Sequence, residues 1–230
     1  LKALSEVVER ARAKGVKAEA ELETGSPAAA IVAAASRLGA DLLVLGTRGN
    51  TGFKHLLLGS VAEAVVRDAE CPVLTVHPRD HRPLDSLRRV LIPTDFSDDA
   101  RHALATVSDL LKGRVGQVEL CLLHVYQLPV MVAPLSGFAP EMPILIEDAR
   151  ELAHKALDPQ AEELRAKGFR VEVIGREGDP ATAITELAKA READLIAMGT
   201  RGLSRLKQVL LGSTAERVVQ HAGCPVLTIR

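Results

Sequence analysis

Three glycines and two hydroxyl residues form the most regular chemical pattern in the chain. Gly199, Gly202 and Gly212 are separated by two and nine residues, and Ser213 and Thr214 follow directly. Glycine lets a phosphate group approach the backbone without a Cβ in the way, and the free N–H groups of a helix that begins near Ser213 favour an anion. The spacing therefore predicts a phosphate-binding loop, although the same glycines would also suit a strand end and a helix cap.

The same pattern occurs earlier in the chain. Residues 1–77 align without a gap with residues 154–230, and the offset is 153 (154 − 1) throughout. A repeat of this length indicates duplication of a domain. In the first copy, the counterparts of the three glycines and the serine are Gly46, Gly49, Gly59 and Ser60.

The second copy alternates predicted strands and helices. Strands are expected at residues 90–93, 118–125, 170–174, 195–198 and 225–229, and helices begin at Ser97 or Asp98, after the loop at 127–143, at Asp179-Pro180 and near Ser213. This alternation predicts an α/β fold with a doubly wound parallel sheet of five strands in the order 3-2-1-4-5. Ligands bind such sheets at the carboxyl ends of the strands, where the strand order reverses, and Gly199 falls at that place.

The first copy is incomplete. It is expected to contain a helix, a strand at about 17–22, a helix at 27–38, a strand at 42–45, a helix at 60–69 and a strand at 73–76. It has no counterpart of the first β-α-β segment, so the strand at 17–22 has no neighbour in its own domain and must be covered in some other way. Either residues before Leu1 are missing from the sequence, or the partial domain is natural and leans on the other copy.

A polar linker bounded by prolines separates the two copies. We therefore expect a partial domain at residues 1–79 and a complete domain at residues 87–230.

A second motif stands at the end of the first strand of the complete domain, where Pro93, Thr94 and Asp95 follow one another. Together with the G-x2-G-x9-G-[ST] spacing it resembles the universal stress protein family, specifically its ATP-binding branch. The resemblance covers residues 87–230 and the later part of the fold in residues 1–77. It implies a site for ATP, with AMP or ADP as alternatives. Any Mg²⁺ would have to be held by the phosphates, Ser213 and water.

The resemblance also implies a role for each site residue. Asp95, with Pro93 and Thr94 beside it, would lie next to adenine and ribose, Val125 would contribute to the adenine pocket, and Met198 and Gly199 would lie near the ribose. Gly202, Gly212, Ser213 and Thr214 would contact the phosphates, and Arg201 would either neutralise them or remain a solvated loop charge. Asp95 could also act only as a helix cap, and Val125 and Met198 would be buried in either case. Gly46, Gly49, Gly59 and Ser60 could hold phosphates, but nothing in the first copy is recognisable as an adenine site.

Members of the family commonly associate through their fifth strands. This implies that residues 73–76 pair antiparallel with residues 226–229 as an intramolecular pseudo-dimer, and that the protein forms homo-oligomers through the same strand.

The function that these features predict is a stress-response regulatory protein in which occupancy by the nucleotide changes stability or association, and not an enzyme. Two alternatives remain: a slow ATPase or autophosphorylating enzyme, and a structural dimer module with a vestigial site. Hydrolysis usually requires carboxylates that hold a metal ion, and the sequence shows no acid near the glycine motif, which favours retention of the nucleotide over turnover.

Composition and charge argue against several other classes of protein. The net charge is −1 and aromatic residues make up 2% of the chain, which argues against a nucleic-acid partner. No apolar run reaches the ~18–20 residues that a membrane span requires. Cys71, Cys121 and Cys224 are far apart and indicate neither a disulfide framework nor a metal cluster, so the cytoplasm is the expected location. His124 lies within an apolar strand and is interpreted as a structural histidine.

Overall fold

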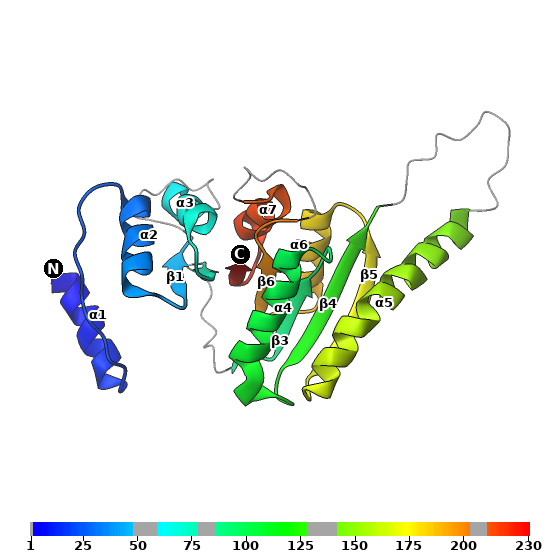
Figure 1. Ribbon diagram of the computed structural model, residues 1–230, viewed down its shortest axis with the longest axis horizontal. Helices are drawn as coiled ribbons and strands as arrows, with labels where there is room; N and C mark the ends of the chain where they lie inside the picture. Colours follow the sequence, from blue (N-terminus) through cyan, green and yellow to red (C-terminus); the bar gives the residue numbers. More distant parts are fainter. Residues whose placement is uncertain (1, 48–58, 78–85, 128–141, 203–210) are drawn as a thin grey trace.

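The computed structural model describes residues 2–47, 59–77, 86–127, 142–202 and 211–230, and the side chains of the long helix from residue 149 onward. It is an α/β fold built on one sheet of seven strands in the order β1-β2-β7-β6-β3-β4-β5 (Figure 1). Residues 1–77 form the first half of the chain, and residues 86–230 form the second half.

The second half contains most of the sheet. Its neighbouring strands are all parallel, and β4 pairs with β5 over eight positions, from Glu119↔Arg170 to Tyr126↔Glu177. Its elements are β3 (Arg89–Pro93), α4 (Asp98–Leu111), the 3-10 helix η2 (Lys112–Arg114), β4 (Glu119–Tyr126), α5 (Met142–Ala166), β5 (Arg170–Glu177), α6 (Pro180–Ala190), β6 (Leu195–Gly199), α7 (Ser213–His221) and β7 (Val226–Ile229).

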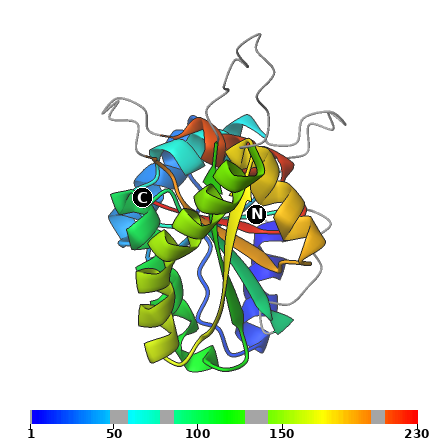
Figure 2. The ribbon, with the colours of Figure 1, turned by 90° about the vertical axis from the view of Figure 1, so that its right-hand side faces the viewer.

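Helices cover both faces of this part of the sheet. One apolar cluster joins alternate strand residues such as Val90 and Leu120 to Val107 of α4 and Leu157 of α5, all of which are fully buried. A second cluster on the opposite face joins the other strand residues to α6 and α7. Figure 2 shows α4 and α5 on one side of the sheet and α6 on the other. Burial on both faces explains why these strands are continuously apolar.

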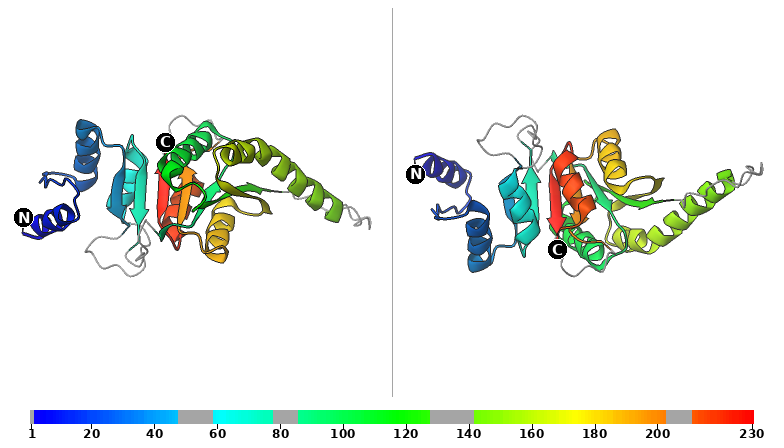
Figure 3. Two further views of the ribbon diagram at one scale, coloured as in Figure 1. Left: turned by 90° about the horizontal axis from the view of Figure 1, so that it is seen from below. Right: turned by 90° about the horizontal axis from the view of Figure 1, so that it is seen from above.

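The first half is much smaller. It contributes two strands at one end of the sheet, and α1 lies at the end of the molecule that is farthest from the second half (Figure 3). Its elements are α1 (Lys2–Ala13), α2 (Pro27–Leu38), β1 (Leu43–Gly46), α3 (Ser60–Asp68) and β2 (Val73–Val76). A third apolar cluster holds Val65, Val66, Ala69 and Val73 together beneath α2.

The two halves join through an antiparallel strand pair. β2 pairs with β7 in the register Val73↔Thr228, Leu74↔Leu227 and Thr75↔Val226, whereas β1 is parallel to β2. Two hydroxyl groups add to this pair: Thr75 Oγ1 donates to the Val226 carbonyl over 3.1 Å, and Thr228 Oγ1 donates to the Val73 carbonyl over 3.2 Å. The predicted antiparallel pairing of these strands within the chain is confirmed.

This pairing bears on two expectations. The two halves share one sheet of seven strands, so the sheet is not limited to the five strands expected for a single copy. Moreover, β7 pairs with both β2 and β6, and β2 pairs with both β1 and β7. Among the described residues, both sides of β2 and of β7 are therefore paired within the chain, and the homo-oligomer expected through the fifth strand stays a prediction.

The strand expected at residues 17–22 does not form. The segment between α1 and α2 has no strand or helix, and Leu22 is 72% exposed. An extended segment needs a neighbouring strand for its N–H and C=O groups, and β1 is separated from this segment by α2 and pairs only with β2 among the described residues. The prediction was therefore wrong because the pairing partner, not the local sequence, decides whether this strand exists.

Among the described residues, no helix is both long enough and apolar enough to cross a membrane.

Candidate functional site

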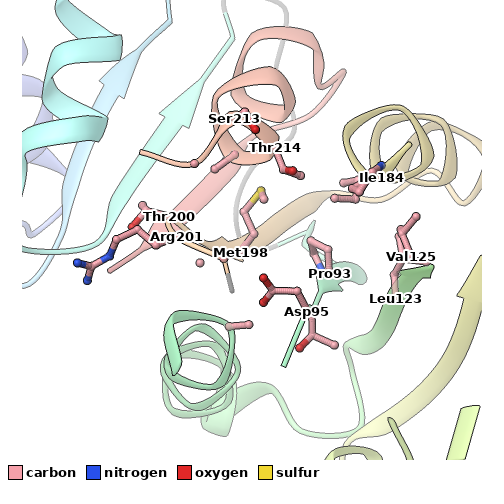
Figure 4. Close-up of a pocket in the computed structure, with 17 residues that line it drawn as sticks. Pro93, Asp95, Leu123, Val125, Ile184, Met198, Thr200, Arg201, Ser213 and Thr214 are labelled. Atoms are coloured by element: carbon pink, nitrogen blue, oxygen red, sulfur yellow. The ribbon is translucent and has the colours of Figure 1, made fainter. Parts of the chain in front are cut away.

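A cavity of about 280 Å³ opens at the carboxyl ends of β3 and β6, where the strand order of the second half reverses (Figure 4). All of the second-half residues that the sequence singled out line this one cavity. The lining residues are Pro93, Thr94, Asp95, Ala100, Leu123, Val125, Pro180, Ile184, Met198, Gly199, Thr200, Arg201, Gly202, Gly212, Ser213, Thr214 and Ala215.

The turn after β3 holds Asp95 at the cavity. The Ser97 backbone N–H donates to Asp95 Oδ1 over 3.0 Å, and the Phe96 N–H donates to Thr94 Oγ1 over 3.1 Å. Ser97 is the N-cap of α4, because its hydroxyl accepts the Ala100 N–H over 3.2 Å. Asp95 is therefore not the helix cap: one carboxylate oxygen stabilises the turn, and the side chain lines the cavity.

This turn is under backbone strain that the surrounding structure must balance. Phe96 has a φ of 64°, in the left-handed region that bulky side chains rarely adopt. Its ring lies 4.7 Å from the ring of His124, centroid to centroid, with an angle of 43° between the planes. His124 Nδ1 is 2.9 Å from the Thr94 carbonyl oxygen, and because a carbonyl only accepts, Nδ1 carries the proton. His124 is thus a structural histidine, as the sequence indicated, and it fixes the turn that carries Asp95.

Close contacts surround each of the three glycines. A Cβ on Gly199 would lie 2.8 Å from the Asp99 carbonyl carbon and 2.9 Å from the Ala100 nitrogen, so β6 packs directly against the start of α4. A Cβ on Gly202 would lie 2.6 Å from Asp95 Oδ2, and one on Gly212 would lie 3.1 Å from the Thr200 carbonyl oxygen. Gly199 is therefore explained by helix packing alone, whereas Gly202 keeps space open next to the carboxylate at the cavity.

The start of α7 forms the polar end of the cavity. Gly212 is the N-cap and supplies no side-chain hydrogen bond, in contrast to α4 and α6, which Ser97 and Asp179 cap. The Gly212 N–H donates to the Thr200 carbonyl over 2.7 Å, which fixes the end of the loop. Ser213 and Thr214 follow and line the cavity. Uncapped N–H groups at a helix start favour an anion.

The opposite end of the cavity is apolar. Leu123 and Val125 lie two residues apart on β4 and therefore on the same face, and Ile184 comes from α6 (Figure 4). Leu123, Ile184, Pro180 and Ala100 were not among the residues singled out from the sequence. The spacing of two residues between Leu123 and Val125 was the signal that could have identified Leu123.

Arg201 is directed away from the cavity (Figure 4) and is bound to an acid. Its Nε donates to Asp99 Oδ2 over 3.0 Å, and its Nη2 is 3.4 Å from Asp99 Oδ1. The same Oδ2 accepts the Arg201 N–H over 3.2 Å and the Thr200 hydroxyl over 3.3 Å. The sequence showed no acid near the glycine motif, and this was wrong, because α4 brings Asp99 there from 102 residues away.

The first half repeats the backbone frame of the polar end. The Gly59 N–H donates to the Thr47 carbonyl over 2.7 Å, and Gly59 is the N-cap of α3 with φ −75° and ψ 146°, against −71° and 145° at Gly212. Gly46 ends β1, and Ser60 opens α3. Gly49 lies outside the described residues. Since β1 is the last strand of the described sheet, no described side chain of the first half stands in the place of Asp95 or Val125.

Other reactive groups lie apart from the cavity. In the described part of the chain, no group of three or more His, Cys, Asp or Glu side chains is arranged to hold a metal ion. All three cysteines are free thiols, and burial raises the pKa of the Cys121 thiol to about 12. A thiol with so high a pKa is a poor nucleophile at neutral pH.

Comparison with known proteins identifies a family. The model of the universal stress protein family matches residues 1–77 and 86–230. A universal stress protein of Methanocaldococcus jannaschii is 34% identical over 148 residues, which cover 62% of this chain and 82% of the relative. A universal stress protein of Mycolicibacterium smegmatis is 29% identical over 216 residues, covering 94% of this chain and 70% of the relative.

The solved structures agree with this result. A universal stress protein of Archaeoglobus fulgidus superposes with a TM-score of 0.73 at 29% identity, over 100% of this chain and 75% of that one.

Proposed function

Because the chain belongs to the universal stress protein family, we propose that its second half binds an adenine nucleotide, ATP in the first place, and that occupancy of this site regulates the stability or association of the protein. In this proposal residues 87–230 form the nucleotide-binding domain, and residues 1–79 form a partial domain of the same kind that works in the reducing cytoplasm.

One observation carries the proposal: a single cavity has an apolar end, a carboxylate in the middle and an uncapped helix start at the other end. Leu123, Val125 and Ile184 suit the flat apolar face of a base. The Asp95 carboxylate accepts hydrogen bonds and suits ribose hydroxyls, which donate them. This order of chemical groups matches the order of base, sugar and phosphate in a nucleotide.

The phosphate end is argued from the backbone. Gly202 and Gly212 leave space near the chain, and the N–H groups at the start of α7 favour negative charge. Ser213 and Thr214 supply hydroxyl groups at the same place, and Mg²⁺ would be held by phosphate oxygens and Ser213. The resemblance to the ATP-binding branch of the family favours ATP over AMP and ADP.

Regulation by nucleotide occupancy is favoured over ATP hydrolysis because the two described acids at the site, Asp95 and Asp99, stabilise the fold. Asp95 accepts the Ser97 N–H, and Asp99 holds Arg201 and Thr200. A water or acceptor hydroxyl would need a group positioned to activate it. A ligand that binds only the folded chain then stabilises it by mass action.

The first experiment releases bound molecules from freshly purified protein by denaturation and separates them by ion-exchange chromatography at 260 nm. The expected result is about one adenine nucleotide per chain, recovered as ATP. Recovery of ADP alone, with continued release of phosphate from added ATP, would favour the slow ATPase. No nucleotide, and no binding of ATP with Mg²⁺ in calorimetry, would leave the structural dimer module.

The residue-level test compares Asp95 with a neighbouring acid at the start of α4, Asp98. We expect Asp95→Ala to weaken ATP binding about 10- to 100-fold, because a hydrogen bond to a charged group is worth roughly 1.5–3 kcal/mol. Asp98→Ala is the matched control, since the Asp98 side chain is 95% exposed and pairs with Arg101 at the surface. Equal affinities of the two variants in titration calorimetry would contradict the role of Asp95.

A further inference from the structure

We propose that Leu211 makes the affinity of the nucleotide site depend on the first half of the chain, an inference that rests on the proposed nucleotide binding. Leu211 directly precedes Gly212, which lines the cavity. Its side chain is partly buried and packs against two clusters at once. One is the second-half cluster beneath α6 and α7, and the other is the first-half cluster of Val65, Val66, Ala69 and Val73.

This contact belongs to a larger seam between the halves, by which we mean the β2–β7 pair and the apolar side chains that cross it. Ala62 of α3 is only 2% exposed and lies within the second-half cluster. Leu45 of β1 packs against both clusters, as Leu211 does. Figures 1 and 3 show α3 and α7 side by side over this part of the sheet. The loop end that carries Gly212 is therefore held partly by the first half.

The position of Gly212 leaves little room for movement. Its N–H is bound to the Thr200 carbonyl, and even a methyl group on it would come within 3.1 Å of that oxygen. On its other side the chain is anchored through Leu211. If the first half moves away from β7, Leu211 loses part of its packing, and the N–H groups at the start of α7 lose their fixed place at the cavity.

Linkage makes the effect reciprocal. If docking of the first half improves nucleotide affinity by some factor, nucleotide binding strengthens that docking by the same factor. Nucleotide binding in a cavity built only from second-half residues thereby strengthens the docking of the first half. Leu211 acts as a positioning residue that need not touch the nucleotide.

The test uses the full chain, calorimetric titration with ATP and Mg²⁺, and hydrogen exchange of the backbone amides. In the wild type, ATP should slow exchange in α3 and β2 of the first half as well as around Asp95. Leu211→Ala should lower the affinity about tenfold and abolish the slowing in α3 and β2, while slowing around Asp95 remains. Leu211→Met, which keeps the apolar volume, should restore both effects.

A second variant weakens the seam without touching Leu211 or the cavity. The double substitution Thr75→Val and Thr228→Val removes the two hydroxyl bonds between β2 and β7 at nearly constant side-chain volume. It should lower ATP affinity severalfold. Val173→Ala is the matched control, because Val173 is also partly buried but lies on β5, at the opposite edge of the sheet. Its ATP affinity should equal that of the wild type.

The outcomes separate this inference from the proposed function. Wild-type affinity in Leu211→Ala, or first-half exchange that ATP does not change, overturns the coupling while the nucleotide site stands. Absence of ATP binding by the wild type overturns both. Loss of affinity in Leu211→Ala and in the threonine double variant, but not in Val173→Ala, supports the coupling.

Discussion

Leu4 and Leu157 occupy equivalent positions in the repeat, yet Leu4 is 36% exposed and Leu157 is fully buried at 0%. Val44 and Ala197 form a second such pair, with exposed fractions of 59% and 0%. Leu157 lies on α5, which packs against β4 and β5, and Ala197 lies in β6 with β3 on one side. The first half has no described counterparts of β3, β4 and β5, so apolar residues at the equivalent positions remain at the surface.

In contrast to this burial, the polar end of the site has a close counterpart in the first half. Its frame consists of a strand end, a glycine and a helix start, which are close in sequence, and the Gly59–Thr47 hydrogen bond reproduces the Gly212–Thr200 bond at the same 2.7 Å. The apolar end requires β3, β4 and α6 together. Local geometry therefore survives in an incomplete copy, whereas burial and the base-binding end depend on distant segments.

The largest effect is expected from truncating the two equivalent leucines, one buried and one exposed. Leu157→Ala should lower the free energy of unfolding by about 2–5 kcal/mol, because it removes buried methyl groups and leaves a cavity. Leu4→Ala should change it by less than about 0.5 kcal/mol, as surface substitutions do. Urea unfolding followed by circular dichroism measures both. Equal losses would mean that Leu4 is buried in solution.

A smaller effect is expected from adding one methyl group at the strand ends. Gly199→Ala should cost about 1–3 kcal/mol of unfolding free energy, because the new Cβ meets the backbone of α4 at 2.8 Å and that backbone must shift. It should also weaken ATP binding, since α4 carries the turn with Asp95. Gly46→Ala, at the exposed counterpart, should be nearly neutral in the same urea titration. A large cost at Gly46 would show that its surroundings are as crowded as those of Gly199.

The smallest effect concerns charge at the start of α6. Arg217 and then Thr182 hold the pKa of the Asp179 carboxyl well below its usual range. Arg217 Nη1 donates to Asp179 Oδ1 over 2.8 Å, but both side chains are about half exposed, at 49% and 45%, so the stabilisation is small. The equivalent residues in the first half are Ser26 and Ala64, which form no such pair.

The sign of the pH effect follows from the lowered pKa. A carboxyl whose pKa is lower in the folded state stabilises the fold above its unfolded pKa, and this stability is lost as the pH falls. Asp179→Ser, which keeps a capping hydroxyl, should lower the melting temperature slightly at pH 7, and the difference from wild type should shrink between about pH 5 and pH 3. Ser26→Asp in the first half should give no comparable pH-dependent gain. A difference that grows with acidity would contradict the pairing.

The fold was largely predictable because its signals are local. The apolar runs and the caps Ser97 and Asp179 located the helices and strands of the second half, and the glycine spacing located the polar end of the cavity. Features set by distant partners were missed. The strand at 17–22 was expected where no described strand pairs with it, and β5 continues to Glu177 because β4 offers eight paired positions. Asp99 could not be placed beside Arg201 without knowing that β6 packs against α4.

The reversal of strand direction between β2 and β7 determines which half of the chain a ligand or a docked protein can contact. The carboxyl ends of β3, β6 and β7 lie at one end of the strands of the sheet, and those of β1 and β2 lie at the opposite end. A small molecule in contact with Gly199 and Gly212 therefore cannot also contact Gly46 and Gly59. A protein that docks at one of these ends likewise contacts one half alone, so any coupling between the halves must pass through the seam.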